Sequence, residues 1–180
     1  MRVISGSVRG RKLKTPVGSE IRPTADLIKE SIFNIVQFDI EGRRVLDIFA
    51  GTGQLGIEAL SRGAQSAVFV DFSQYSIKLI SENLRLCGFS EYARVIRSDA
   101  LKYLRNSEKF DLIFIDPPYG ENITDEILKK IIEFDKLYDN GIIIIEMSAD
   151  TIAPTVSLPY MLNKEYKYGG VKIVKYSKQS

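Results

Sequence analysis

The chain has 180 residues, a formal net charge of +2, 44% hydrophobic and 27% charged residues, as in an ordinary globular protein. This length suits one compact domain, so residues 1–180 are expected to form a single one. With one cysteine and no histidine, an internal disulfide and the usual zinc and histidine-based catalytic sites are excluded. No apolar run approaches the roughly 20 residues that span a bilayer, and no signal peptide is present, so we expect a cytoplasmic protein without membrane contact.

Positive charge is concentrated at both ends of the chain. Residues 1–15 contain five basic side chains and no acidic one: Arg2, Arg9, Arg11, Lys12 and Lys14. Lysines also dominate the carboxyl-terminal end. A solvated surface would explain either cluster, and a polyanionic partner would explain both.

The first predicted elements form an extension that precedes the core. Residues 3–6 and 10–14 predict a small basic strand pair, or β-hairpin, and residues 25–36 repeat apolar residues at helical spacing. In the Arg22-Pro23-Thr24 link, proline favours an extended Arg22, and Thr24 is suited to cap the following helix. We therefore divide the domain into a basic extension, residues 1–24, and a catalytic core, residues 25–180.

Short runs rich in Val, Ile and Phe then alternate with segments of helical period, which predicts a mostly parallel sheet covered by helices on both faces. Five strands are expected at residues 45–49, 67–71, 93–96, 111–115 and 141–146, with intervening helices that include 55–62, 73–87 and 125–134. Two more strands, 161–168 and 171–176, flank Gly169-Gly170, a connection typical of a β-hairpin. The prediction is an α/β fold with a seven-stranded sheet whose last strand is antiparallel to the rest.

A glycine-rich loop lies between the strand at 45–49 and the helix after it. Gly51, Gly53 and Gly56 fit the G-x-G-x-x-G spacing, and Asp71 ends the next strand. Glycines let the backbone turn tightly and approach a ligand, and a carboxylate one strand over can accept hydrogen bonds from two ribose hydroxyls. The pattern predicts an adenosine cofactor, and by itself it suits a nicotinamide dinucleotide equally.

Two further carboxylates favour S-adenosylmethionine over a dinucleotide. Asp47 lies just before the glycine loop, where it would hold loop amides and a methionine amino group but repel a pyrophosphate. Asp99 follows the third strand and would accept from the adenine amino group, and a helix N-cap role is compatible with this. Four further residues complete the candidate cofactor-binding set: Thr24, Phe49, Phe72 and Ala100.

The tetrapeptide Asp116-Pro117-Pro118-Tyr119 follows the fourth strand, so it opens at the carboxyl edge of the sheet, where ligands of such sheets bind. An exocyclic base amine is a poor nucleophile because its lone pair is delocalised into the ring. Asp116 and the Pro117 carbonyl would accept hydrogen bonds from this amine and localise the lone pair, while the prolines hold both acceptors rigidly. Tyr119 would stack on the base.

These four residues, Asp116, Pro117, Pro118 and Tyr119, are therefore the predicted catalytic loop of an amine methyltransferase. No metal is expected, because the sulfonium of S-adenosylmethionine already carries the leaving group. A proline turn with a packed Tyr119 and no catalytic role is the plainer alternative.

Residues 47–64 and the tetrapeptide together resemble the RsmD family of bacterial 16S rRNA guanine-N2 methyltransferases. Four segments at the chain ends resemble signatures of the same family: residues 2–6, 9–13, 22–24 and 168–172. The resemblance implies a class I S-adenosylmethionine-dependent methyltransferase fold, which is Rossmann-like, with S-adenosylhomocysteine as the product. The implied acceptor is the N2 amine of one specific guanine in 16S rRNA, in the assembled or assembling small ribosomal subunit. RNA contacts are then expected from four basic residues: Arg9, Arg11, Lys12 and Arg22.

Departures from the family pattern are modest. The family more often has Thr at Ala25, a small residue at Gln54, Glu at Asp71 and a charged residue near Phe72. Asp71 keeps the carboxylate, one methylene shorter, so ribose binding should survive. An adenine-N6 or protein-glutamine methyltransferase with the same tetrapeptide remains the alternative. The hypothesis of a nicotinamide dehydrogenase would rest on the glycine loop alone. We expect the protein to be a monomer.

Overall fold

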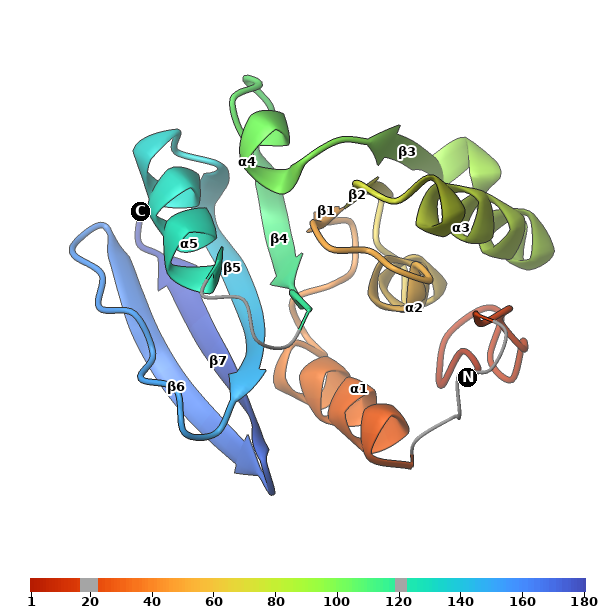
Figure 1. Ribbon diagram of the computed structural model, residues 1–180, viewed down its shortest axis with the longest axis horizontal. Coiled ribbons are helices and arrows are strands. Elements are labelled where there is room, and N and C mark those ends of the chain that lie inside the picture. The colour runs from red at the N-terminus through yellow and green to blue at the C-terminus, as the bar shows by residue number, and fades with distance from the viewer. Residues whose placement is uncertain (17–22, 119–122) are drawn as a thin grey trace.

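The computed structural model describes residues 1–16, 23–118 and 123–180, and of residues 23–25 it describes only the backbone (Figure 1). The strands are β1 (Arg44–Asp47), β2 (Ser66–Asp71), β3 (Ala93–Arg97), β4 (Phe110–Ile115), β5 (Leu137–Ser148), β6 (Tyr160–Tyr168) and β7 (Val171–Lys178). The helices are α1 (Pro23–Ile35), α2 (Gln54–Ser61), α3 (Gln74–Cys87), α4 (Ala100–Tyr103) and α5 (Ile123–Glu133), with a short 3-10 helix, η1 (Ser90–Tyr92). None of these helices is long and apolar enough to cross a membrane, a finding limited to the residues just given.

The strands form one seven-stranded sheet in the order β3-β2-β1-β4-β5-β7-β6. Strands β1 to β5 pair with one another in parallel, and β7 runs antiparallel to both β5 and β6. This confirms the predicted fold class. The carboxyl ends of the adjacent strands β2, β1 and β4 therefore lie side by side, on the same side of the sheet.

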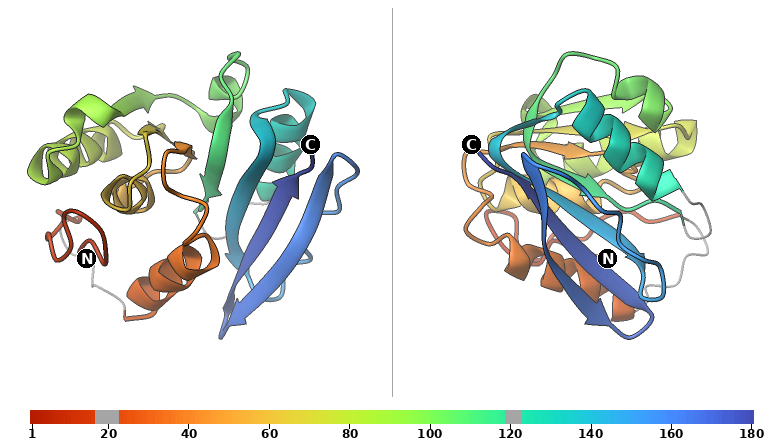
Figure 2. Two further views of the ribbon diagram at one scale, coloured as in Figure 1. Left: turned by 180° about the vertical axis from the view of Figure 1, so that it is seen from behind. Right: turned by 90° about the vertical axis from the view of Figure 1, so that its left-hand side faces the viewer.

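Helices cover both faces of the sheet (Figure 2), and an apolar layer lies between the helices and the strands on each face. On β5, Ile142 and Ile144 pack in the layer that contains residues of α1, α2 and α3. Ile143 and Ile145 pack in the opposite layer, with residues of α4 and α5. A strand buried on both faces is what its unbroken run of isoleucines predicts.

The main differences from the predicted elements lie at their ends. β5 begins at Leu137, before the predicted start at 141, because Leu137 already pairs with Phe110 of β4. The register then shifts between Phe110 and Leu112, opposite the segment in which Asn140 adopts φ 62°. Gly88 ends α3 in the left-handed conformation (φ 75°), as predicted. The predicted amino-terminal strand pair is reduced to a single antiparallel bridge between Arg2 and Lys12.

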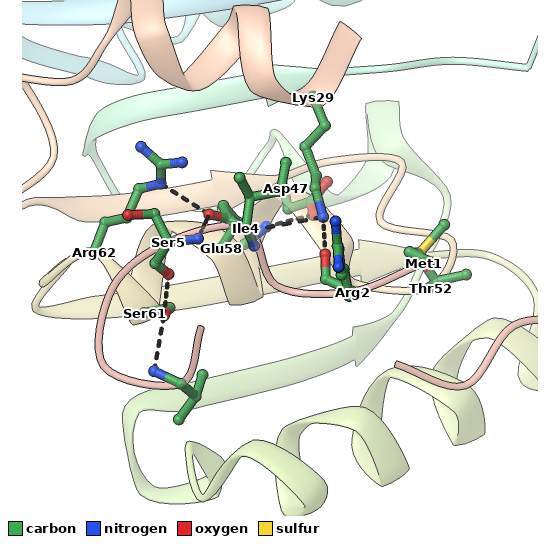
Figure 3. A network of polar contacts seen from close by, with 12 residues as sticks. Met1, Arg2, Ile4, Ser5, Lys29, Asp47, Thr52, Glu58, Ser61 and Arg62 are labelled. Atoms are coloured by element: carbon green, nitrogen blue, oxygen red, sulfur yellow. Dashed lines mark hydrogen bonds and ion pairs between the residues drawn. The ribbon is translucent and has the colours of Figure 1, made fainter. Parts of the chain in front are cut away.

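The amino-terminal extension lies beside α2 and α3 and is fastened to the core by a buried polar network (Figure 3). The Glu58 carboxylate of α2 accepts hydrogen bonds from the amides of Ile4 (2.8 Å) and Ser5 (2.9 Å). Glu58 is fully buried, and so is Val3 on the underside of the extension. The extension is therefore held from below by a carboxylate that water does not reach.

Two cations compensate the buried Glu58 charge. Arg62 donates to Glu58 from one turn further along α2 (2.9 Å) and lies over the Phe33 ring at 4.8 Å. The Lys29 ammonium of α1 is 3.6 Å from Glu58 and donates to the carbonyl of Arg2 (2.5 Å). Burial lowers the pKa of Lys29, an effect that the Glu58 charge opposes. Lys29 and Glu58 thus tie α1, α2 and the extension together.

We expect Glu58→Gln to destabilise the protein by about 3 to 5 kcal/mol, because it leaves the Lys29 ammonium buried without its counter-ion. The double variant with Lys29→Met should recover part of that loss, because both charges are then absent. Urea denaturation measures both effects, and hydrogen exchange should show reduced protection at Ile4 and Ser5. Glu82→Gln is the matched control, because it breaks an exposed ion pair with Lys14 and should change stability little. A Glu58→Gln variant as stable as this control would contradict the anchoring role.

Candidate active site

A cavity of about 820 Å³ opens at the carboxyl edge of the sheet, a volume within the range of small-molecule sites. Nine of the residues predicted from sequence line it: Phe49, Gly51, Asp71, Phe72, Asp99, Ala100, Asp116, Pro117 and Pro118. They come from segments that directly follow β1, β2, β3 and β4. The parallel sheet therefore brings the predicted cofactor and catalytic residues to one place.

The glycine loop connects β1 to α2 along the cavity. Gly53 precedes α2 in the left-handed conformation (φ 78°), which only glycine adopts readily. Gly56 is required for a different reason, because a Cβ there would lie 2.3 Å from the Phe69 ring of β2. One glycine thus allows the turn, and the other allows α2 to pack closely on the sheet.

Asp71 holds the two loops that border the cavity at the end of β2. One carboxylate oxygen accepts from the Gly51 amide (2.9 Å) and the other from the Ser73 amide (2.8 Å). A carboxylate oxygen has two lone pairs, so each can accept one further hydrogen bond from the cavity side. Asp71 is thereby fixed in orientation and still able to take two hydroxyl donors.

Asp47 lies beneath the glycine loop and does not line the cavity. Its carboxylate is buried, 2% exposed, and accepts a hydrogen bond from the Gly56 amide (3.0 Å). Burial raises the pKa of Asp47 to about 7, with a further contribution from the charge of Asp71. Of the loop amides that we expected Asp47 to hold, Gly56 is the one it binds.

Asp116 is partly exposed at the end of β4, where Pro117 and Pro118 also line the cavity. Desolvation by the surrounding protein raises its pKa well above the usual value, and the charges of Glu146 and Asp47 add to this. A carboxyl group in such a setting is a good proton acceptor once ionised. Tyr119, the fourth residue of the predicted loop, lies outside the described residues.

The α4 side of the cavity contains Asp99, Ala100 and Ser98. Asp99 is the N-cap of α4, with one oxygen accepting from the Lys102 amide (2.9 Å), so the predicted capping role is confirmed. Phe72, across the cavity, is 71% exposed and presents an aromatic surface. Sequence reasoning missed five lining residues: Ile48, Ser73, Ser76, Ser98 and Ile123. Ser73 and Ser98 are next in sequence to the predicted site residues Phe72 and Asp99, and this proximity could have indicated that they line the cavity.

Three of the four predicted RNA-contacting residues lie in the described part of the extension. Arg9, Arg11 and Lys12 are exposed, and within residues 1–16, 23–118 and 123–180 no ion pair involves them. Arg22 lies outside the described residues, and the Thr24 side chain is likewise not described. Three free cations on an anchored segment form a positive surface available to a polyanion.

The extension also contacts the glycine loop through Asn83, a buried residue of α3 that sequence reasoning missed. The Asn83 amide donates to the carbonyls of Thr52 (2.9 Å) and Lys14 (3.1 Å), and its oxygen accepts from the Lys14 amide (2.7 Å). The Thr52 hydroxyl in turn donates to the sulfur of Met1 (3.3 Å). Asn83 therefore holds both the extension and the glycine loop in place through hydrogen bonds.

Comparison with known proteins places these features in a family. A family model described as "Conserved hypothetical protein 95" matches residues 1–177. The chain is 39% identical to "Putative rRNA methyltransferase YlbH" of Bacillus subtilis over 99% of this chain and 100% of that protein. It is 32% identical to "Ribosomal RNA small subunit methyltransferase D" of Escherichia coli over 100% and 91%. The solved structure "Putative methyltransferase yhhF from Escherichia coli" superposes with a TM-score of 0.89 at 29% identity, over 100% of this chain and 98% of that one.

The raised pKa of Asp47 predicts how its replacement changes stability. Asp47→Asn keeps an oxygen for the Gly56 amide but cannot ionise. The pKa of Asp47 is about 7 in the folded protein, against 3.8 ordinarily, so wild-type stability falls as pH rises between these values. Without ligand, the variant should exceed wild type at pH 8 by on the order of 4 kcal/mol, and the gap should close near pH 4.

Denaturant titrations at several pH values test this expectation, with the exposed Asp150→Asn variant as control. The control should follow wild type at each pH. A gap between Asp47→Asn and wild type that does not change with pH would show that folding does not raise the pKa of Asp47.

Proposed function

The chain belongs to the RsmD family of methyltransferases, and on this premise we propose that it methylates the N2 amine of a specific guanine in 16S rRNA, with S-adenosylmethionine as donor. The substrate form is the assembled or assembling small ribosomal subunit. The observation that carries the proposal is the 820 Å³ cavity, which Gly51, Asp71 and Asp116 line together. Donor-binding and acceptor-binding residues thus face the same space.

The lining of the cavity fits an adenosine cofactor with a cationic tail. Asp71 has two oxygens oriented by backbone amides, as two ribose hydroxyls require. Phe72 and Ala100 supply apolar surface for an adenine ring, and the second oxygen of Asp99 is suited to its amino group. Asp47 and Asp116 concentrate negative charge close by, which favours a ligand with an ammonium and a sulfonium. When bound, S-adenosylmethionine supplies a methyl group on a sulfonium, a good leaving group.

Asp116 and the Pro117 carbonyl are the proposed acceptors for the two N–H bonds of the guanine amine. These hydrogen bonds localise the lone pair on N2 and direct it toward the methyl carbon. As the nitrogen–carbon bond forms, N2 must lose a proton, and the ionised Asp116 carboxylate is the group proposed to take it. The raised pKa of Asp116 makes that transfer favourable. Tyr119 is proposed to stack on the base.

The amino-terminal residues 1–24 are proposed to contact RNA, and residues 25–180 to form the catalytic part of the same domain. Arg9, Arg11, Lys12 and Arg22 would contact the RNA backbone. We also propose that the enzyme acts as a monomer in the cytoplasm, and that its chemistry requires no metal.

A direct test supplies radiolabelled donor with unmodified small subunits, naked rRNA, DNA or protein. We expect label in the small subunit, at one guanine N2 when the methylated nucleotide is mapped. Asp116→Asn keeps the shape of the side chain but cannot accept the proton, so its rate should fall roughly a hundredfold or more. Asp150→Asn should retain the full rate.

Binding of S-adenosylhomocysteine, measured by calorimetry, shows whether each variant retains a folded cofactor site. Label found only in DNA adenine or in protein glutamine would refute the rRNA assignment. Full methylation by Asp116→Asn would refute the assigned role of that carboxylate.

The positive surface of the extension predicts how RNA binding depends on salt. Replacing Arg9, Arg11 and Lys12 by Gln removes three cations, each of which contributes about 0.7 to 0.9 to the slope of log affinity against log salt concentration. We therefore expect the slope to fall by about 2 and affinity for S-adenosylhomocysteine to stay unchanged. Fluorescence anisotropy with an rRNA fragment, between low and moderate salt, measures the slope.

A matched triple replacement uses Lys102, Arg105 and Lys129, which are exposed on the α4 and α5 side of the sheet and form no ion pair with the described residues. It should leave the slope as in wild type. Equal slopes for both triple variants would show that the charges of the extension are only a solvated surface.

A further inference from the structure

A second, smaller cavity of about 270 Å³ lies between the amino-terminal extension and α1. Arg2 and Arg9 line it from the extension, and Asp26 and Glu30 line it from α1. It is smaller than the roughly 300 to 1,000 Å³ of sites for drug-sized ligands. Its size suits a small group, such as one nucleobase.

The four charged side chains of this cavity are not paired with one another. In the described part of the chain, none of them forms an ion pair or a side-chain hydrogen bond. Two cations and two carboxylates that share a cavity without pairing leave their hydrogen-bonding capacity available. A complementary ligand must then offer both acceptors and donors.

The walls of the cavity are held in place by the buried network under the extension. The Arg2 carbonyl accepts from Lys29, and Lys29 lies between Asp26 and Glu30 on α1. The amide of Ile4, which also lines the cavity, donates to Glu58. Both walls are thus tied to the same pair of buried charges and present their side chains from an anchored backbone.

The residues of the cavity match one base better than the others. Guanine has two adjacent acceptors, O6 and N7, which an arginine binds in bidentate fashion, and Arg2 is the arginine of the cavity with no other proposed RNA contact. On its other edge it has two adjacent donors, N1–H and N2–H, which a carboxylate binds in the same way. Sequence-specific RNA recognition typically reads these edges in unpaired bases.

We propose that the cavity bounded by Arg2, Arg9, Asp26 and Glu30 binds an unpaired guanine of the RNA substrate other than the methylated one. This inference rests on the proposed function for its RNA substrate. Met1, next to Arg2, contacts Thr52 of the glycine loop. Thr52 adjoins Gly51, which lines the cofactor cavity, so a base bound by the extension would be linked to that cavity through a short path and would orient the RNA for methylation.

Short uridine-rich RNA oligonucleotides with one central guanine, adenine or inosine test the proposal by fluorescence anisotropy. Wild type should bind the guanine oligonucleotide roughly tenfold more tightly than the adenine one. Inosine lacks the N2 amine, so it should lose part of this preference without any change to the protein. The double variant Asp26→Asn with Glu30→Gln should bind guanine and adenine within about twofold of each other.

The matched control removes two exposed carboxylates elsewhere, with Glu91→Gln and Asp150→Asn, and should keep the guanine preference. Binding of S-adenosylhomocysteine confirms that each variant is folded. A wild type without guanine preference, or a preference that persists in the Asp26→Asn, Glu30→Gln variant, would overturn the proposal.

The methylation assay distinguishes this failure from failure of the proposed function. Normal labelling of the small subunit with no guanine preference in the oligonucleotides would refute only the second base site. Absence of label in any RNA would refute the proposed function, whatever the oligonucleotides show.

Discussion

Burial of the Asp47 carboxylate beneath the glycine loop is the constraint on which the rest of the site depends. The central strand β1 carries this acid to the carboxyl edge, and the amide of Gly56 is its hydrogen-bond donor. A buried carboxylate close to Asp71 and Asp116 disfavours ionisation of both Asp47 and Asp116. A cationic ligand relieves that repulsion, so the same arrangement that costs stability without ligand favours a cationic donor. Burial of these carboxylates thus lowers the stability of the unliganded protein and increases its preference for a cationic ligand.

The amino-terminal extension is part of this arrangement. Asn83 binds the carbonyl of Thr52 in the glycine loop and the backbone of Lys14 in the extension. Glu58 holds the extension two residues beyond Gly56 on the same helix. Movement of the extension would therefore displace the glycine loop that borders the cofactor cavity. A few buried hydrogen bonds thus connect the proposed RNA-binding surface with the proposed catalytic residues.

Most of the fold and cavity could be predicted because their signals are local. Asp71 ends a predicted strand, the glycine loop, Asp99 and Asp116 each follow one, and the parallel topology alone brings strand ends together. The network around Lys29 and Glu58 could not be predicted in this way. A lysine in an amphipathic helix is ordinarily exposed, and its burial depends on a carbonyl 27 residues away in sequence. The role of Asn83 could not be predicted either, because its hydrogen-bond partners come from two separate segments of the chain. The strand pair expected in the extension is only partly formed. Backbone hydrogen bonds such as that from Val3 to Arg11 join its two arms, but side chains of α2 and α3 accept from the amides of Ile4, Ser5 and Lys14, so a regular ladder does not continue.

The position of β7 has a consequence for how the molecule forms during synthesis. β7 is the last strand in sequence, but it lies between β5 and β6 and pairs with both. Until β7 has left the ribosome, the hydrogen-bonding edge of β5 has no partner in the sheet, and β6 has nothing to dock against. The five-stranded part of the sheet from β3 to β5 can assemble earlier, because β2, β3, β4 and β5 each pair with a strand already made. The residues that line the cofactor cavity all belong to segments made before β6 and β7, so the floor of the cavity can be organised before the sheet is complete.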